Sequence, residues 1–338
     1  MKRMLKYAVA AAAVTLSAHA AQAEFDKASM RYASFLASNY YQTQSDQLFI
    51  EEVETGSGGA IKIEPFWQGT MGGSYEMLNL VRSGAVDFAA VVPGFFPSEL
   101  TFTAVTNALP MVFFEGKKVV NASRVLFEEN PSIKAELEKN NMKPLIFRYL
   151  PNYRIMCTSP VKTLEDLKGK KILSYGTYVP EVFKAFGAVP VDNDLPDVYE
   201  NLSRGVLDCA YLHHAGMEFR KWHEVAPYLS DIDFGAINAY TIMMNLQKFN
   251  SLSEDTQKLI EEAAAKATEK AIGDMGAKDE EGRAALLAGG AELVVFEEKE
   301  KLAEMVPDMV AVWVENMTGQ GHGEAAEAVA SQVKELTQ

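Results

Sequence analysis

Short runs of apolar residues alternate along the chain with longer stretches in which apolar and polar residues recur at helical spacing. The short runs predict buried strands, and the amphipathic stretches between them predict helices. The strands expected from this pattern are 29–34, 60–66, 87–92, 143–147, 154–158, 171–173, 207–211 and 239–245. Strands that alternate with helices are typical of α/β proteins built around parallel sheets.

Two helical segments can be placed more closely. The helix at 164–167 follows Thr163, whose hydroxyl can cap it while Asp166 reaches back, and it stops at Gly169. From residue 253 to about residue 287 runs an Ala- and Glu-rich stretch without proline, long enough to cross two lobes as a brace. Two ordinary helices, broken near Gly273 or Gly276, are the alternative.

An internal similarity connects two distant segments. Residues 75–87, YEMLNLVRSGAVD, resemble residues 199–208, YENLSRGVLD, with three residues fewer in the helix. Each segment reads as helix, glycine turn and strand, in which the glycine adopts a left-handed conformation and an Asp opens the strand. The chain would then use the same helix-to-strand turn once in each lobe, and a chance likeness of two amphipathic helices is the alternative.

The N-terminal segment has the features of a cleaved secretory signal. Three basic residues precede an apolar run over 7–18, and small residues follow in AHA and AQA. The run is too short to span a bilayer of about 30 Å, and no Cys follows that would direct lipoprotein processing. We therefore expect residues 1–23 to be removed on export to the periplasm.

Length and charge define the class of the exported chain. Its 315 residues exceed what one hydrophobic core usually serves, so two lobes are expected. The expected division is lobe I at 24–150 with part of 237–285, and lobe II at 151–236 with part of 286–338. Removal of three basic residues changes the net charge from −14 to −17, which argues against nucleic acid as a partner.

Cys157 and Cys209 are the two cysteines of the chain, and both lie in strand-like runs. In an oxidising compartment an even count permits one disulfide. Two buried thiols are the simpler interpretation, and neither cysteine has the neighbouring Cys or His spacing of a metal or redox motif.

Several motifs, in order, carry a resemblance to a known family. QGTMGGSYEM at 68–77, followed by RSGAVD at 82–87, resembles the "QLGGEREMLEGVRLGTIDM" region of solute-binding proteins of tripartite ATP-independent periplasmic (TRAP) transporters. The segment from FFP at 95–97 to LPMVF at 109–113 resembles the family segment that ends in "LPFLF". VKTLEDLKGKKI at 161–172 resembles "IKSPEDLKGLKIR", and GAVP at 187–190 and GVLD at 205–208 fall where "GANPV" and "GVVDGQE" belong.

This resemblance covers nearly the whole exported chain and implies a two-lobed, Venus-flytrap α/β receptor with crossing strands and a long bridging helix. A small organic ligand would be buried between the lobes and delivered to the integral membrane subunits of the transporter. It implies no enzymatic activity, no cofactor and no metal, and a monomer is expected. The carboxyl ends of parallel strands at a domain interface are where such sites form.

One departure from the family concerns charge. The family arginine that follows the "LKGLKI" strand and binds the ligand's carboxylate is replaced here by Leu173, while the arginine of the family's "R-x-x-T" strand is present as Arg154. Arg154 is therefore the candidate acid-binding residue, because a guanidinium can hold a carboxylate by two parallel hydrogen bonds. A surface or hinge arginine paired with an acidic residue is the alternative.

A second departure concerns shape. Where the family has "VDGQENP" this chain has LDCAYLHH at 207–214, so aromatic and imidazole side chains replace small polar ones. Such residues could form the wall of a pocket for an apolar or aromatic ligand, or a cage around a cation. The candidate ligand-binding residues beside Arg154 are Tyr175, Tyr211, His213, His214, Phe95, Tyr75, Tyr178, Ser174 and Pro93, with Ser34 or Asn39 as weaker candidates.

Three other functions are alternatives to an acid receptor. A metal-dependent enzyme finds support only in the His213–His214 pair with nearby His223 and Glu224, since no catalytic motif accompanies them. A receptor for an amine or neutral solute would explain the lost arginine, with Glu76, Glu200 and the DND loop at 192–194 as possible carboxylates. Delivery of the ligand to a sensor kinase cannot be separated from transport by sequence.

Overall fold

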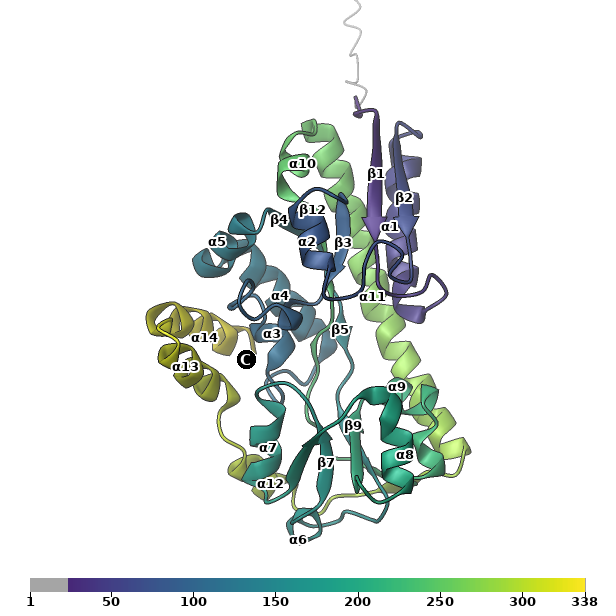
Figure 1. The fold of residues 1–338 in the computed structure, drawn as a ribbon, viewed down its shortest axis with the longest axis vertical. Coiled ribbons are helices and arrows are strands. Elements are labelled where there is room, and N and C mark those ends of the chain that lie inside the picture. Colours follow the sequence, from purple (N-terminus) through teal and green to yellow (C-terminus); the bar gives the residue numbers. More distant parts are fainter. Residues whose placement is uncertain (1–23, 338) are drawn as a thin grey trace, which may run out of the picture.

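The computed structural model describes residues 24–337, so the signal peptide predicted at 1–23 lies outside the described residues. Two bodies, lobe I and lobe II, are stacked along the long axis of the molecule (Figure 1). The predicted two-lobed α/β fold is confirmed.

Lobe I is built on a five-stranded sheet with the order β2-β1-β3-β12-β4. Its strands are β1 (Ala28–Ala33), β2 (Ile61–Phe66), β3 (Phe88–Val91), β4 (Met142–Ile146) and β12 (Thr241–Asn245). Its helices are α1 (Gln44–Gly56), α2 (Met77–Arg82), α3 (Val105–Ala108), α4 (Gly116–Glu129), α5 (Pro131–Lys139) and α10 (Leu246–Asn250), with the 3-10 turns η1 (Tyr41–Thr43) and η2 (Pro93–Phe95).

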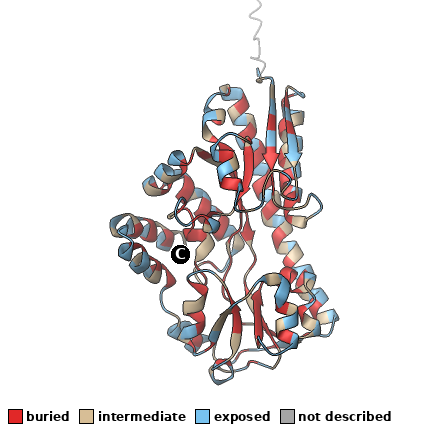
Figure 2. Cartoon of the chain, in the orientation of Figure 1, coloured by how far each residue is buried: buried red, intermediate tan, exposed pale blue. Residues whose placement is uncertain are grey.

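Both faces of the lobe I sheet are covered, which is why its central strands are continuously apolar. Phe88 and Ala90 of β3 belong to a core shared with α1, where the rings of Phe49 and Phe88 lie 5.4 Å apart. Ala89 and Val91, which alternate with them, face the core that includes residues of α2 and α4. Figure 2 shows the buried positions gathered in the central strands of both lobes.

Lobe II is built on a six-stranded sheet with the order β13-β10-β6-β9-β7-β8. Its strands are β6 (Arg154–Cys157), β7 (Lys171–Ser174), β8 (Val189–Asp192), β9 (Cys209–Leu212), β10 (Tyr228–Ser230) and β13 (Glu292–Val294). Its helices are α6 (Leu164–Leu167), α7 (Val179–Ala185), α8 (Val198–Ser203), α9 (His214–Phe219) and α12 (Lys299–Met305), with η3 (Leu195–Asp197) and η4 (Trp222–Glu224).

The chain crosses between the lobes through two short paired strands, β5 (Tyr149–Leu150) and β11 (Ile237–Asn238). The strands that follow them are antiparallel to their neighbours: β6 to β9 and β10, and β12 to β3 and β4. The sheets are therefore mixed, where the sequence predicted parallel sheets. The physical reason is that each crossing brings the chain into a lobe from the opposite end.

A single helix, α11 (Glu254–Ala288), passes along both lobes (Figure 1). It continues unbroken through Gly273 and Gly276, so the single-helix interpretation holds and the two-helix alternative is wrong. The last two helices, α13 (Met309–Gly319) and α14 (Gly323–Thr337), lie against lobe I, where Asn130 Nδ2 donates to Gln332 Oε1 at 3.1 Å.

One local prediction in lobe II is confirmed and another is corrected. The Asp166 carboxylate accepts a hydrogen bond from the Thr163 N–H at 2.9 Å, and Gly169 after α6 has a positive φ of 71°. Cys157 and Cys209 are directly opposite in the β6–β9 register and form a disulfide, so the interpretation as two thiols is wrong. The disulfide connects the crossing strand of lobe II to the strand next to it.

Candidate functional site

The candidate residues lie mostly where parallel strands end. β1, β2 and β3 are parallel in lobe I, and β7, β8 and β9 are parallel in lobe II. Pro93 and Phe95 follow β3, Ser174 and Tyr175 end and follow β7, and His213 follows β9. Because the carboxyl ends of parallel strands share one edge of a sheet, each lobe presents its loops at a single edge.

Four rings gather at that edge of lobe II, and we call Tyr153, Tyr175, Tyr211 and His213 the aromatic cluster. The centroid of the Tyr153 ring lies 4.8 Å from that of Tyr211, 6.3 Å from that of Tyr175 and 6.0 Å from that of His213. The structure thus brings together three residues that the sequence named. Tyr153 was missed, although it directly precedes the crossing strand β6, whose first residues meet the end of β9.

The aromatic cluster is supported from behind. The Tyr211 ring packs edge-on against Phe183 of α7 at 5.2 Å and against Phe234 at 5.4 Å, so it forms the base of the cluster. Burial raises the pKa of Tyr153 to about 12 and those of Tyr175 and Tyr211 well above their ordinary value. All three phenols are therefore neutral at physiological pH and keep their O–H groups as hydrogen-bond donors.

Ser174, the last residue of β7, is buried directly before Tyr175, and its Oγ has no hydrogen-bond partner in the described chain. Buried polar atoms usually have a partner, so this hydroxyl is available to a ligand or a bound water. Leu173, at the position of the missing family arginine, is completely buried in the core of lobe II. Its side chain therefore serves packing.

Arg154 is not free. Its Nη1 forms an ion pair with Asp233 Oδ1 at 2.6 Å, and the Asp233 carboxylate also accepts from Asn152 Nδ2 at 2.9 Å and from the Gly235 N–H at 2.8 Å. The same Nη1 donates to the Tyr153 carbonyl at 3.2 Å. This arrangement is the alternative that the sequence left open, an arginine paired with an acidic residue near the crossing strands.

His214 contacts Asp279 of α11, as does His213 of the aromatic cluster, whose Nδ1 lies 3.5 Å from Asp279 Oδ1. The His214 Nδ1 lies 2.8 Å from Asp279 Oδ2, and the other oxygen of Asp279 accepts from the Ala215 N–H at 3.0 Å. Burial acts to raise the pKa of Asp279, but hydrogen bonds and charge from His213 and His214 outweigh it and hold the pKa well below its ordinary value. The contact fixes the start of α9 to the long helix, and its geometry explains His214 without a ligand.

The remaining candidates are dispersed. Tyr75 and Phe95 stack at 5.0 Å on lobe I, where they are 65% and 41% exposed. Tyr178 donates its hydroxyl to Asn316 Oδ1 of α13 at 3.3 Å, and Pro93 is buried at the start of η2. Neither Tyr178 nor Pro93 has a ring contact with the aromatic cluster.

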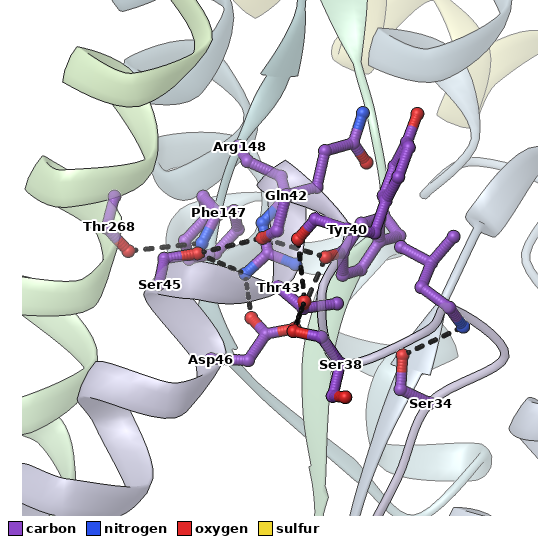
Figure 3. Close-up of polar contacts among 12 residues, drawn as sticks. Ser34, Ser38, Tyr40, Gln42, Thr43, Ser45, Asp46, Phe147, Arg148 and Thr268 are labelled. Atoms are coloured by element: carbon purple, nitrogen blue, oxygen red, sulfur yellow. Dashed lines mark hydrogen bonds and ion pairs between the residues drawn. The ribbon is translucent and has the colours of Figure 1, made fainter. Parts of the chain in front are cut away.

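The loop after β1 brings Tyr40 of lobe I toward lobe II. Thr43 Oγ1 lies within hydrogen-bond distance of the carbonyls of Ala37, Ser38 and Tyr40, at 3.1, 2.9 and 2.8 Å, and its one O–H can donate among them, which fixes the loop on the first turn before α1 (Figure 3). The phenol of Tyr40 lies close enough to Tyr153 to act on its pKa, in the direction that raises it.

Beneath this loop lies a buried ion pair. Arg148 Nη2 and Asp46 Oδ1 are 2.5 Å apart and almost inaccessible to solvent, and the guanidinium carbon lies 3.9 Å from the centroid of the Tyr240 ring (Figure 3 shows the Asp46–Arg148 contact). The Tyr240 hydroxyl also bonds Asp46 Oδ2 at 3.2 Å. Arg148 and Tyr240 belong to the two connections between the lobes, so the pair fixes both where they enter lobe I.

Arg220, directly after α9, was not singled out by the sequence. Its Nη1 donates to the Gly216 carbonyl at 3.1 Å, and within residues 24–337 no carboxylate forms an ion pair with it. Its charge acts on Tyr153 and Tyr175 in the direction that lowers their pKa values. The sequence motifs shared with the family do not include Arg220, so they could not identify this residue.

Two features are absent from residues 24–337, a membrane-spanning helix and a metal-binding cluster. No helix in that range is long and apolar enough to cross a membrane. Nor do three or more His, Cys, Asp or Glu side chains of those residues gather in a group that could hold a metal ion. A surface hollow of about 1340 Å³ between α4, α5, β4 and α11 contains none of the candidate residues.

Comparisons with known proteins agree with this fold. A family described as "Bacterial extracellular solute-binding protein, family 7" matches residues 32–319. The ectoine-binding periplasmic protein TeaA of Halomonas elongata is 26% identical over 293 residues, 81% of each chain. The C4-dicarboxylate-binding protein DctB of Bacillus subtilis is 25% identical over 257 residues, 72% of this chain and 69% of DctB.

Solved structures share the architecture. A TRAP periplasmic solute-binding protein from Ochrobactrum anthropi superposes with a TM-score of 0.78 at 21% identity, covering 93% of this chain and 97% of that one. A TRAP solute-binding protein from Rhodoferax ferrireducens, in complex with copurified benzoate, gives 0.73 at 21% identity over 92% and 98% of the two chains. At such identities the likeness establishes the fold.

Proposed function

Because this chain belongs to the bacterial extracellular solute-binding proteins of family 7, we propose that it is the periplasmic receptor of a TRAP transporter and binds a small organic acid between its lobes. It would carry the acid as a monomer to the integral membrane subunits and would catalyse no reaction. The observation that carries the proposal is the aromatic cluster at the strand ends of lobe II.

The chemistry of the cluster supports an acid with an apolar or aromatic body. Aromatic faces bury the body, while neutral phenol O–H groups and the unpartnered Ser174 hydroxyl can donate to carboxylate oxygens. The acid-binding role predicted for Arg154 requires its ion pair with Asp233 to open or to be shared with the ligand.

The test is a thermal-shift screen of the purified exported chain, followed by native mass spectrometry of any copurified solute. Uronates, dicarboxylates, aromatic acids, amines and neutral sugars form the panel. A bound acid at 100 times its Kd should stabilise the protein by about 2.7 kcal/mol. Stabilisation by amines or neutral solutes alone would replace the acid, and turnover of any compound in the panel would remove the receptor function.

A further inference from the structure

Neither of the two positions at which the family has an arginine supplies a free cation in this chain. Leu173 replaces one arginine and is buried in the core, and Arg154 is neutralised by Asp233. A cation that meets the ligand strengthens the binding of an acid, because charge-assisted hydrogen bonds are roughly twice as strong as neutral ones. We propose that Arg220 binds the ligand's carboxylate and that the aromatic cluster accepts a planar apolar body, so that the ligand is an aromatic monocarboxylate. This inference rests on the proposed function.

The position of Arg220 follows from the short helix α9. The Gly216 carbonyl accepts from Arg220 Nη1 at 3.1 Å, and the Gly216 N–H donates to His213 Nδ1 at 3.2 Å. His213 is itself a member of the aromatic cluster, 6.0 Å from the Tyr153 ring. The guanidinium therefore lies one helical turn from the cluster, and its charge reaches the hydroxyls of Tyr153 and Tyr175.

Arg220 has donors to spare. A guanidinium has five N–H groups in a planar fork. Among the described residues, the Gly216 carbonyl is the hydrogen-bond acceptor of the Arg220 guanidinium. The guanidinium carbon lies 5.7 Å from the Phe219 ring and 6.0 Å from the Trp222 ring, which supports its orientation. Four of the eight arginines among residues 24–337, Arg220 included, form no ion pair with a carboxylate, which leaves Arg220 able to meet an external anion.

The balance of charges favours a ligand with one carboxylate over a ligand with two. Asp233 compensates Arg154 at 2.6 Å, whereas no carboxylate among residues 24–337 forms an ion pair with Arg220. A second carboxylate would face phenols only, without a charge to offset its desolvation. The four rings pack against one another around Tyr153, at centroid distances of 4.8 to 6.3 Å, and aromatic surface suits a planar apolar body better than a polyhydroxylated one.

The test measures binding of phenylacetate, its neutral analogue phenylacetamide, and succinate by calorimetry on four chains: the unmodified receptor, Arg220→Gln, Arg220→Lys and Arg154→Ala. Glutamine keeps a donor for the Gly216 carbonyl and removes the charge, so folding is preserved, and circular dichroism and the Tm check this. We expect phenylacetate to bind the unmodified receptor at least ~30-fold more tightly than the amide, and Arg220→Gln to lose at least ~30-fold.

Lysine should restore only part of the affinity, because a point charge cannot reproduce the fork. Arg154→Ala should change affinity less than Arg220→Gln does. Tight phenylacetate binding that survives Arg220→Gln, or that is lost only in Arg154→Ala, would overturn the assignment of Arg220. Preference for succinate would overturn the monocarboxylate class, and the absence of binding to any organic acid in the wider screen would instead refute the proposed function.

Discussion

Asp87 and Asp208 make the same hydrogen bonds in the two lobes. The Asp87 carboxylate accepts from the Arg31 N–H at 2.7 Å, and the Asp208 carboxylate accepts from the Lys171 N–H at 2.8 Å. Each carbonyl accepts at 2.9 Å from a residue at the end of the crossing strand, Asn245 or Thr158. The internal similarity seen in the sequence is therefore a structural repeat of helix, left-handed glycine and strand, used once per lobe.

This equivalence predicts matched effects of matched substitutions. Asp87→Ala and Asp208→Ala should each lower the free energy of unfolding by about 1–2 kcal/mol, because each leaves a strand N–H without its acceptor. Asp→Asn at either position retains an acceptor oxygen and should lose less. Urea unfolding of the four variants checks this, and a large effect in one lobe with none in the other would contradict the equivalence.

The buried Arg148–Asp46 pair predicts a strongly non-additive response. Asp46→Ala should destabilise the chain by roughly 3–5 kcal/mol, since it leaves a buried guanidinium without its carboxylate. The double variant Asp46→Leu with Arg148→Met removes both charges and should recover much of that loss. A double-mutant cycle by thermal or urea denaturation measures the coupling, and simple additivity of the two single effects would show that the pair is not coupled.

Asp279 predicts a pH dependence of stability. Its pKa in the folded chain is below that of an unfolded carboxyl group, so the ionised form stabilises the fold above the unfolded pKa, and this contribution is lost as the pH falls below about 4. Asp279→Asn should lower the free energy of unfolding at pH 7 by about 1.5–3 kcal/mol and flatten the decline in acid.

Asp274→Asn is the matched control, because Asp274 lies on the same helix and pairs with Lys270 in a half-exposed ion pair. Exposed pairs contribute about 0–1 kcal/mol, so the control should hardly change. Unfolding curves at pH 7, 5, 4 and 3 make the comparison. Identical pH profiles for Asp279→Asn and the unmodified chain would remove the role assigned to this carboxylate.

Two glycines of α11 should respond in opposite directions to the same substitution. A Cβ at Gly282 would lie 2.6 Å from the Ala215 Cα, whereas a Cβ at Gly273 would meet nothing within 4 Å. Gly282→Ala should therefore separate α9 from α11 and cost about 1–3 kcal/mol. Gly273→Ala should stabilise the helix by about 0.5–1 kcal/mol. The Tm values of the two variants decide the matter.

Features that depend on neighbouring residues could be predicted from the sequence, whereas features that depend on distant residues could not. Apolar runs located eight strands, because a buried strand has apolar residues in its own segment of sequence. The positions of Tyr175, Tyr211 and His213 followed from the ends of those strands. The antiparallel direction of β6 and β12 could not be read, since it depends on where the chain crosses. The two-residue strands β5 and β11 are strands because they pair with each other, and this pairing connects residues far apart in the sequence.

The same limit applies to the charges of the site. Arg154 and Asp233, like His214 and Asp279, are far apart along the chain, and no local pattern pairs them. Whether Arg220 has an ion-pair partner also depends on residues far away in the sequence, because it depends on which carboxylates are paired with other cations. The ligand-binding roles of the candidate residues accordingly stay predictions.

The long helix α11 acts mechanically as one continuous beam. Thr268 Oγ1 accepts from the Phe147 N–H at the lobe I side, and Asp279 fixes the start of α9 at the lobe II side. Because the beam is fixed to both bodies, the lobes cannot slide along it, and any change in their separation has to bend the beam or strain its attachments. Opening and closing are thus elastically coupled to a helix whose Asp279 also contacts the aromatic cluster, since its Oδ1 lies 3.5 Å from His213 Nδ1.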